Sequence, residues 1–388
     1  MNRFTFHNPT KIIFGEGALQ QLSKYLPEKK KILLLYGGGS IKKNGVYDQA
    51  VNALKRGSFL EFGGIEPNPR YETIMKAVEL SRQEKVDFIL AVGGGSVIDA
   101  AKFMALAIHY TQGDPWEILV NKTAKEIKHV VPLATVLTLP ATGSEMNMYS
   151  VISRDSTREK LSFGAPSCYP VFSILDPTVI KTIPQNQIAN GITDAYTHVL
   201  EQYLTYPANA PIQDRFAESI LKTLIEEGPK VMKNPNDMVA AGNFMWSATM
   251  ALNGIISAGV PTDWATHAIG HELTALYGID HARTLAIIAP NLYKSVFNAK
   301  KEKLAQYATR VWDVTAGTDD DKAAAAIEKT LGFFHGLGIK TKLSEYTADF
   351  KGTSEEIVRR FKEREIESLG ENNQITLEKV REIVEMSY

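Results

Sequence analysis

The sequence has 388 residues, of which 44% are hydrophobic and 22% charged, the composition of an ordinary globular protein. Its 43 basic and 44 acidic residues give a formal net charge of −1, so the charge balance argues against a nucleic-acid or membrane-surface partner. The length is sufficient for two domains, each with its own hydrophobic core.

Up to about residue 180, short β-rich runs alternate with helical stretches. Predicted strands cover residues 31–36, 88–92 and 130–138, and the third is interrupted by Pro132. The first two end in the same Gly-Gly-Gly-Ser sequence. Continuous apolar strands separated by helices indicate a parallel sheet that is covered on both faces.

The turn after the first strand bears on the choice of cofactor. NAD sites commonly place an acidic side chain near the ribose 2′-hydroxyl, whereas a 2′-phosphate is met by hydrogen-bond donors or positive charge. No Asp or Glu follows this strand; Gly38, the Ser40 hydroxyl, Lys42 and Lys43 occupy the region. This pattern favours NADP, although the two lysines could equally be ordinary surface residues.

The second glycine turn, Gly93-Gly94-Gly95-Ser96, precedes an apolar helical run. A turn of this kind lets backbone N–H groups approach a phosphate at the start of a helix. Ser96 and Asp99 have the spacing of a capping box, which predicts a helix start here. A tight strand-to-helix turn with no ligand would look the same, and the sequence is not the G-x-G-x-x-G fingerprint.

After residue 184 almost all signals are helical, which predicts an α/β domain at residues 1–184 and an all-helical domain at 185–388. No Gly/Ser-rich linker separates them, so we expect the two to pack around a shared cleft. Gly278 has the position of a residue that ends a helix. The expected helices cover residues 187–206, 212–227, 238–257, 262–277 and 353–369.

Four of the eight histidines fall in two short windows of the helical half. Asp194 and His198 are four residues apart, as are His267 and His271, so each pair shares a helix face. His281 follows shortly after. One carboxylate and several imidazoles suit Fe(II) or Zn(II), not calcium or magnesium. The first pair alone would more often be a solvated polar face, but two groupings together predict a metal site.

The single cysteine and the absence of long apolar runs indicate the cellular compartment of the protein. Cys168 cannot form an internal disulfide, which fits a reducing compartment, and it is expected to be inert. The first residues contain no apolar run typical of a signal peptide, and no stretch reaches membrane-spanning length. We therefore expect a cytoplasmic protein.

Several motifs resemble those of the iron-containing, or group III, alcohol dehydrogenases, which have a dehydroquinate-synthase-like fold. The resemblance runs over essentially the whole chain and is closest to the NADPH-dependent aldehyde reductase and butanol dehydrogenase branch. Its most specific stretches are 175–201 and 267–284, supported by 36–43, 63–69 and 264–273. It implies an N-terminal Rossmann-like parallel-sheet domain and a C-terminal helical domain.

The resemblance also implies functional residues. Asp194, His198, His267 and His281 would bind one divalent metal, Fe²⁺ or Zn²⁺, with Mn²⁺ and Co²⁺ also possible. His271 would stand beside them, either as the catalytic proton donor, a role that a water relay could fill instead, or as a residue that orients a ligand. The cofactor-binding residues implied are Gly38, Ser40, Gly94, Gly95, Ser96, Asp99, Thr138, Thr142, Asn147 and Lys160.

The activity implied is hydride transfer between NADP(H) and a short- to medium-chain aldehyde or primary alcohol, in a homodimer. One alternative is an NAD-dependent glycerol or polyol dehydrogenase of the same fold. Another is a zinc hydrolase or lyase, but the glutamate follows His271, so the His-Glu-x-x-His motif is absent. A metal-storing or structural protein would leave the glycine turns without a purpose.

Overall fold

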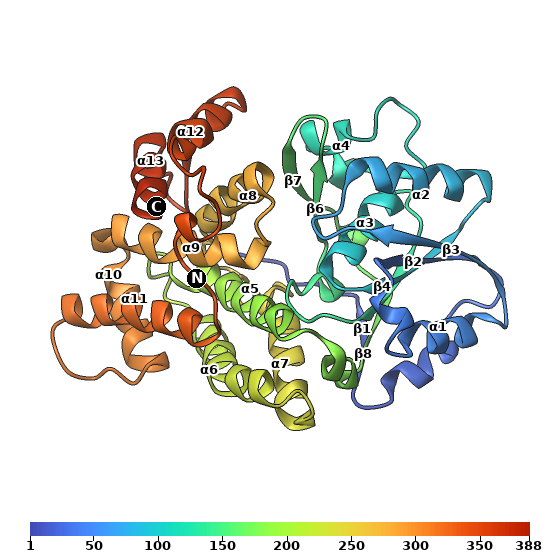
Figure 1. The fold of residues 1–388 in the computed structure, drawn as a ribbon, viewed down its shortest axis with the longest axis horizontal. Coiled ribbons are helices and arrows are strands. Elements are labelled where there is room, and N and C mark those ends of the chain that lie inside the picture. Colours follow the sequence, from blue (N-terminus) through green and yellow to red (C-terminus); the bar gives the residue numbers. More distant parts are fainter. The chain divides into compact units, whose positions relative to one another are not determined.

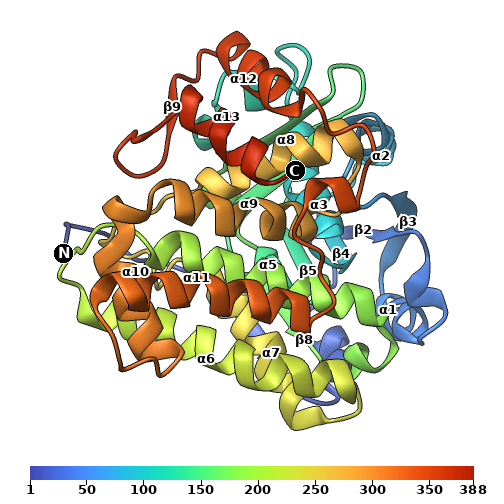
Figure 2. The ribbon, with the colours of Figure 1, turned by 60° about the vertical axis from the view of Figure 1, so that its left-hand side comes forward.

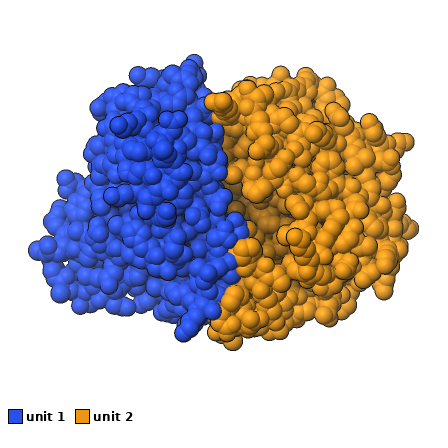
Figure 3. All heavy atoms as spheres, in the orientation of Figure 1, with its two compact units in different colours: residues 1–6, 185–233, 250–388 blue, residues 7–184, 234–249 orange.

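The computed structural model describes all residues, 1–388, and divides into two compact units (Figure 3). Unit 1 comprises residues 1–6, 185–233 and 250–388, and unit 2 comprises residues 7–184 and 234–249. The chain therefore passes between the units after residues 6, 184, 233 and 249. Residues 1–6 and 234–249 each belong to the unit opposite to the domain that the sequence analysis gave them.

Unit 2 is built on a six-stranded parallel sheet with the order β1-β8-β5-β4-β2-β3. Figure 1 labels β1, β2, β3, β4 and β8 of this sheet. A separate antiparallel hairpin, β6–β7, accompanies it. The strands are β1 (Lys11–Phe14), β2 (Lys31–Gly37), β3 (Ser58–Ile65), β4 (Phe88–Gly93), β5 (Leu133–Leu137), β6 (Tyr149–Arg154), β7 (Glu159–Gly164) and β8 (Phe172–Leu175).

The predicted strands β2, β4 and β5 form the centre of the sheet and are buried along almost their whole length. This burial confirms that continuous apolar runs here are strands covered on both faces. The third strand is shorter than expected: it begins at Leu133, because Pro132 has no N–H to donate to a ladder, although its carbonyl accepts from Ile89 N (3.0 Å). Strands β1, β3 and β8 were not predicted.

Helices follow the strands along this part of the chain. They are α1 (Val46–Leu54), α2 (Tyr71–Gln83), α3 (Gly95–Ala107) and α4 (Glu117–Val120). Helix α3 is buried along nearly all of its length and packs against β4 and β6. Short 3-10 helices in this unit are 18–24, 40–42, 124–126, 144–146, 166–168 and 177–182.

Unit 1 is helical, and its long helices α5, α6, α9 and α11 lie side by side (Figure 2). Its helices are α5 (Gln185–Tyr203), α6 (Pro211–Lys233), α8 (Ala265–Tyr277), α9 (His281–Ser295), α10 (Phe297–Val311), α11 (Asp319–Gly336), α12 (Thr353–Glu363) and α13 (Leu377–Met386). A 3-10 helix covers 343–345, and the short pair β9 (Ser368–Leu369) and β10 (Ile375–Thr376) is antiparallel.

Two of the predicted helices extend too far. Helix α12 ends at Glu363 rather than at residue 369, and the remainder leads into β9. Helix α7 (Met238–Ala251) stops before residue 257, and its residues 238–249 belong to unit 2. None of the helices has the length and apolar character needed to cross a membrane.

Candidate functional site

Helix α5 places Asp194 and His198 one turn apart, as the spacing predicted. Neither faces water: Asp194 is 3% and His198 5% exposed. Burial lowers the pKa of His198 to about 4, with the neighbouring Asp194 acting in the opposite direction. The imidazole is therefore neutral near pH 7, which is the form that binds a metal.

Helices α8 and α9 bring the other histidines to the same place. Helix α8 carries His267 and His271 and ends at Gly278, which has φ 67 and donates its N–H to Thr274 O (2.9 Å). This left-handed conformation favours glycine and confirms the predicted helix end. The chain turns there, and His281 begins α9.

The four candidate ligands lie close together within unit 1. Asp194 Oδ1 is 3.8 Å from both His198 Nδ1 and His281 Nε2. Asp194, His267 and His281 can each offer one ligand atom, and those atoms lie within 4.8 Å of one another. His198 is outside that set of three, but its ring stacks on that of His267, with centroids 4.7 Å apart.

His271 lies at the margin of this group. Its ring centroid is 5.0 Å from that of His281 and 6.1 Å from that of His267. It is thus near the candidate ligands without belonging to the set whose ligand atoms converge.

Two buried polar atoms indicate that these residues fit a metal. Asp194 Oδ1 and His198 Nδ1 are both buried and have no hydrogen-bond partner. An orphaned buried carboxylate oxygen and imidazole nitrogen are costly unless something binds them. A divalent cation bound by one carboxylate and several imidazoles would satisfy both atoms, so the donor set fits Fe²⁺ or Zn²⁺.

The sequence analysis missed Glu201, which orients one of the candidate ligands. Its Oε2 contacts His267 Nδ1, and its Oε1 accepts from the backbone N–H of Thr266 (2.6 Å). A carboxylate at Nδ1 fixes the ring and directs Nε2 to a metal. The signal was present, because Asp194, His198 and Glu201 follow i, i+4 and i+7 spacing on α5.

The turn before His281 is held by a second contact that the sequence analysis missed. Asn190 Nδ2 donates to Asp280 Oδ2 (2.8 Å), and Arg283 Nε donates to Asn190 Oδ1 (3.1 Å). Asn190 lies one turn before Asp194 on α5. The same helix that carries two candidate ligands therefore anchors the segment carrying another.

In unit 2, seven of the ten residues predicted to bind the cofactor lie at one edge of the sheet. Gly38 and Ser40 follow β2, Gly94 to Ser96 follow β4, and Thr138 and Thr142 follow β5. Strand β4 pairs with both β2 and β5, so the three segments are neighbours at the carboxyl ends of parallel strands. This is the usual place for a nucleotide in such a sheet.

The glycines of the second turn are required by close packing. A Cβ on Gly93 would lie 2.5 Å from Val97 Cγ2, and one on Gly95 2.5 Å from Thr142 Cγ2. Helix α3 begins at Gly95, but the predicted capping box is wrong, because no side chain caps the helix. Asp99 instead accepts hydrogen bonds from Ser144 Oγ (2.6 Å) and Val151 N (2.9 Å).

At the first turn, Lys42 lies over two aromatic rings, with Nζ 4.9 Å from the Tyr36 centroid and 4.7 Å from that of Tyr47. Both tyrosine hydroxyls donate to Glu61 Oε2 (3.1 and 2.9 Å). The turn itself carries no acid, but the adjacent strand β3 supplies Glu61. Lys160 on β7 donates to Asn68 Oδ1 (2.9 Å).

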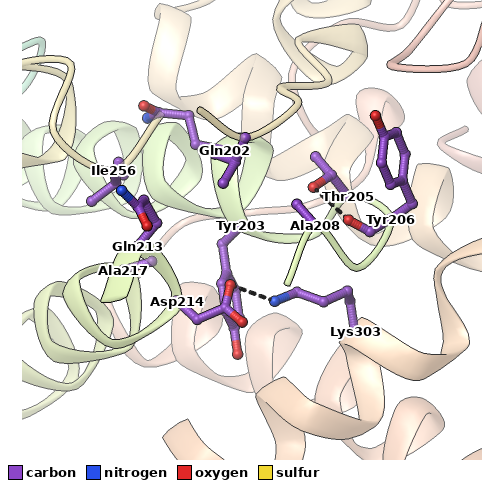
Figure 4. A pocket seen from close by; sticks show the side chains of 11 residues that line it. Gln202, Tyr203, Thr205, Tyr206, Ala208, Gln213, Asp214, Ala217, Ile256 and Lys303 are labelled. Carbon is purple, nitrogen blue, oxygen red and sulfur yellow. Dashed lines mark hydrogen bonds and ion pairs between the residues drawn. The ribbon is translucent and has the colours of Figure 1, made fainter. Parts of the chain in front are cut away.

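A small cavity in unit 1 is not a substrate pocket (Figure 4). It has a volume of about 10 Å³, enough for about one water molecule. Gln202 and Gln213 line it, and each has a buried Oε1 without a hydrogen-bond partner. Lys303 donates to Asp214 Oδ1 (2.8 Å) at its edge.

Comparison with known proteins covers nearly the whole chain. Residues 9–177 match the model for the iron-containing alcohol dehydrogenase, and residues 188–388 match that for the C-terminal part of the Fe-containing alcohol dehydrogenase family. The NADPH-dependent aldehyde reductase YqhD of Escherichia coli is 53% identical over 387 residues, which is 99% of both chains. A probable NADH-dependent butanol dehydrogenase of Bacillus subtilis is 44% identical over 351 residues, 89% of this chain and 90% of the relative. The substrate- and cofactor-free form of the E. coli aldehyde reductase superposes with a TM-score of 0.92 at 50% identity, covering 100% of each chain.

Proposed function

This chain belongs to the iron-containing alcohol dehydrogenase family, and from that membership we propose that it is an NADPH-dependent reductase of short- to medium-chain aldehydes. In the reverse direction it would oxidise the corresponding primary alcohols. One observation carries the proposal: ligand atoms of the buried Asp194 and His267 and of the half-buried His281 lie within 4.8 Å of one another, although the three residues come from three helices. A site of this kind suits an ion that binds a carbonyl oxygen.

The metal would be held by Asp194, His198, His267 and His281, as Fe²⁺ or Zn²⁺. When bound, the metal polarises the carbonyl oxygen of the substrate, and reduced nicotinamide supplies the hydride. The contact between Glu201 and His267 Nδ1 keeps that imidazole in one orientation. The alcohol oxygen also needs one proton, which we assign to His271 because it lies beside the candidate ligands.

The cofactor would be held by unit 2. The backbone N–H groups of Gly94, Gly95 and Ser96 lie at the start of α3. The N-terminal end of a helix favours a negatively charged group such as a diphosphate. Thr138, Thr142, Asn147 and Lys160 would line the rest of the nucleotide site. Asp99 would act indirectly, because both of its carboxylate oxygens already accept hydrogen bonds from the protein.

NADPH rather than NADH is supported by the turn of Gly38 and Ser40, which carries no carboxylate. NADH remains the alternative, since several butanol dehydrogenase relatives are named as NADH-dependent. A homodimer and a cytoplasmic location are likewise proposals, the second supported by the single cysteine, Cys168, which is buried.

One assay tests this function. The purified protein is given NADPH or NADH with a series of C2 to C8 aldehydes, and absorbance at 340 nm is followed while the metal content of the same sample is measured. We expect turnover that depends on the metal and is faster with NADPH. Turnover that needs no nicotinamide, or none with any aldehyde in the metal-loaded protein, would contradict the proposal.

A further inference from the structure

Helix α3 carries a lysine, Lys102, whose side chain is completely buried within unit 2. Lysine is almost never fully buried unless its charge is paired. Its Nζ donates to Ser144 Oγ (2.7 Å), to Asn147 Oδ1 (3.0 Å) and to the carbonyl oxygen of Tyr149 (2.7 Å). All three acceptors belong to one segment, residues 144–149. The three N–H groups of the buried Lys102 ammonium therefore all hold the same segment.

The same segment is tied to α3 a second time. Asp99 lies three residues before Lys102, on the same helix face. Ser144 Oγ accepts from Lys102 and donates to Asp99 Oδ1 (2.6 Å), so the hydroxyl bridges the two charges. Burial raises the pKa of Asp99 and lowers that of Lys102 to about 8, while each charge favours the ionised form of the other. Removing one member of such a buried network leaves the others uncompensated.

The segment is also adjacent to the glycine turn. Thr142 packs on Gly95 so closely that a Cβ there would lie 2.5 Å from its Cγ2, and Leu139 packs on Gly94 in the same way, at 3.0 Å. Asn147 Nδ2 donates to Gly143 O (2.9 Å), which ties the segment to the residue just before it. The position of residues 139–149 relative to the turn therefore depends on what anchors residues 144–149.

We propose that Lys102 is a positioning residue for the nicotinamide cofactor, and that its ammonium group holds residues 142–149 against the turn of Gly94 and Gly95. The proposal rests on the proposed function. It adds Lys102, which would affect cofactor binding by holding the residues of the neighbouring segment in place. The anchored segment is ordered when the protein folds, so binding does not have to order it. Loss of the anchor should therefore weaken cofactor binding more than it slows the chemical step.

The test compares two buried lysines. Lys102→Met keeps most of the side-chain volume and removes the charge. Lys303→Met is the matched control, because Lys303 is 3% exposed, donates to Asp214 and lies in unit 1. For each variant the dissociation constants of NADPH and NADH are measured by fluorescence titration, together with the cofactor KM, kcat and metal content.

We expect Lys102→Met to raise the dissociation constant and KM of the cofactor about tenfold, as for one lost charge-assisted hydrogen bond. Its kcat at saturating cofactor should stay within about threefold, with the metal content unchanged. Lys303→Met should leave both cofactor constants unchanged. A folded Lys102→Met variant with normal cofactor binding, or one that lost only kcat, would overturn the proposal.

If Lys102→Met does not fold, a milder variant tests the positioning role of Lys102. Ser144→Ala removes the oxygen that joins Lys102 to Asp99 and leaves the ammonium two acceptors. We expect weaker cofactor binding, by roughly threefold or more, and unchanged binding would refute the positioning role. The unmodified protein is titrated first: failure to bind either dinucleotide there would count against the proposed function itself, whereas normal binding in every variant would count only against Lys102.

Discussion

Glu201 on α5 contacts His267 on α8 through a carboxylate oxygen at Nδ1 of the imidazole, and its other oxygen accepts from the N–H of Thr266 (2.6 Å). One buried side chain thus fixes both the first turn of α8 and the ring that this turn carries. Carboxylates placed in this way set the orientation of metal-binding histidines.

Glu201→Gln should therefore weaken metal binding without removing a ligand. An amide cannot hold the imidazole as a carboxylate does, and we expect the affinity to fall by roughly ten- to a hundredfold. Competition with a chelator measures it. The control is Glu218→Gln on α6, a buried carboxylate that accepts from the Tyr203 hydroxyl (2.8 Å). Equal metal affinity in the two variants would show that Glu201 does not orient a ligand.

Replacing His267 or His281 with Ala should abolish turnover and greatly lower the bound metal. Each change removes one of the four proposed ligands and would leave an open, weakened site. Metal analysis and the NADPH assay on the same preparation measure both effects. His335→Ala provides a control, since His335 bonds Thr341 elsewhere in unit 1 (2.9 Å). A His267 or His281 variant with full metal and activity would make the ligand assignment wrong.

His271→Ala should behave differently, losing most of its activity while keeping most of its metal. The reason is that the four proposed ligands can hold the metal without it, while its ring lies beside theirs, with a centroid 5.0 Å from that of His281. The metal content and kcat of this variant are compared with those of His267→Ala. A comparable loss of metal would make His271 a ligand, and undiminished activity would exclude it as the proton donor.

Gly38→Asp should reverse or erase the preference for NADPH. A Cβ at Gly38 would meet no atom within 4 Å, so the substitution creates no clash at the backbone of the turn. The carboxylate of the aspartate would repel a 2′-phosphate and would accept a hydrogen bond from a free 2′-hydroxyl. A charge-assisted phosphate contact is worth about 1.5–3 kcal/mol, or roughly ten- to a hundredfold in affinity.

The effect of Gly38→Asp should appear in the KM of the cofactor, with that of the aldehyde nearly unchanged. Gly38→Ala is the control, because it adds bulk without charge and should keep the preference. If the unmodified enzyme used both cofactors equally, or if the aspartate changed nothing, this turn would not recognise the adenosine ribose.

A buried triad in unit 1 predicts how stability depends on pH. Lys300 Nζ lies 2.7 Å from Asp263 Oδ2 and 3.0 Å from Glu371 Oε2. Burial raises the pKa of Glu371 to about 7, and its hydrogen bond with Asp263 adds to the rise. Because this pKa is higher in the folded than in the unfolded protein, stability present below about pH 4.5 is lost as the pH rises towards 7.

Glu371→Gln should remove that part of the pH dependence, which amounts to about 3 kcal/mol at most, since each pKa unit is worth about 1.4 kcal/mol. Urea unfolding at pH 5 and pH 8 measures the free energy of unfolding for both proteins. Glu378→Gln, whose carboxylate is 81% exposed, should keep the pH dependence of the unmodified protein. An identical pH dependence in Glu371→Gln would show that Glu371 is not the group responsible.

Features that depend on local spacing could be predicted from the sequence. Helical periodicity placed Asp194 and His198 on one face of α5, and a glycine at position 278 was enough to end α8. The central strands were also recognisable, because strands buried on both faces are continuously apolar. In these cases neighbouring residues alone determine the local structure.

Features that depend on distant partners could not be predicted. Asp99 has the spacing of a helix-capping residue. Its carboxylate instead accepts hydrogen bonds from Ser144, which is 45 residues away, and from Val151. The edge strand β1 is only partly buried and carries a mixed pattern. Glu201 had the right helical spacing for the site, yet its role depends on how α8 packs on α5.

The order of the two units along the chain has a consequence for synthesis on the ribosome. Unit 2 draws its last residues, 234–249, from beyond a whole segment of unit 1. Among them Thr249 donates its hydroxyl hydrogen to the buried carboxylate of Glu145, which lies within the segment held by Lys102. A nascent chain that has just emerged up to residue 184 still lacks this partner, so unit 2 cannot form the contact until residues made after helix α6 have emerged. A fragment that ends at residue 184 would lack them permanently.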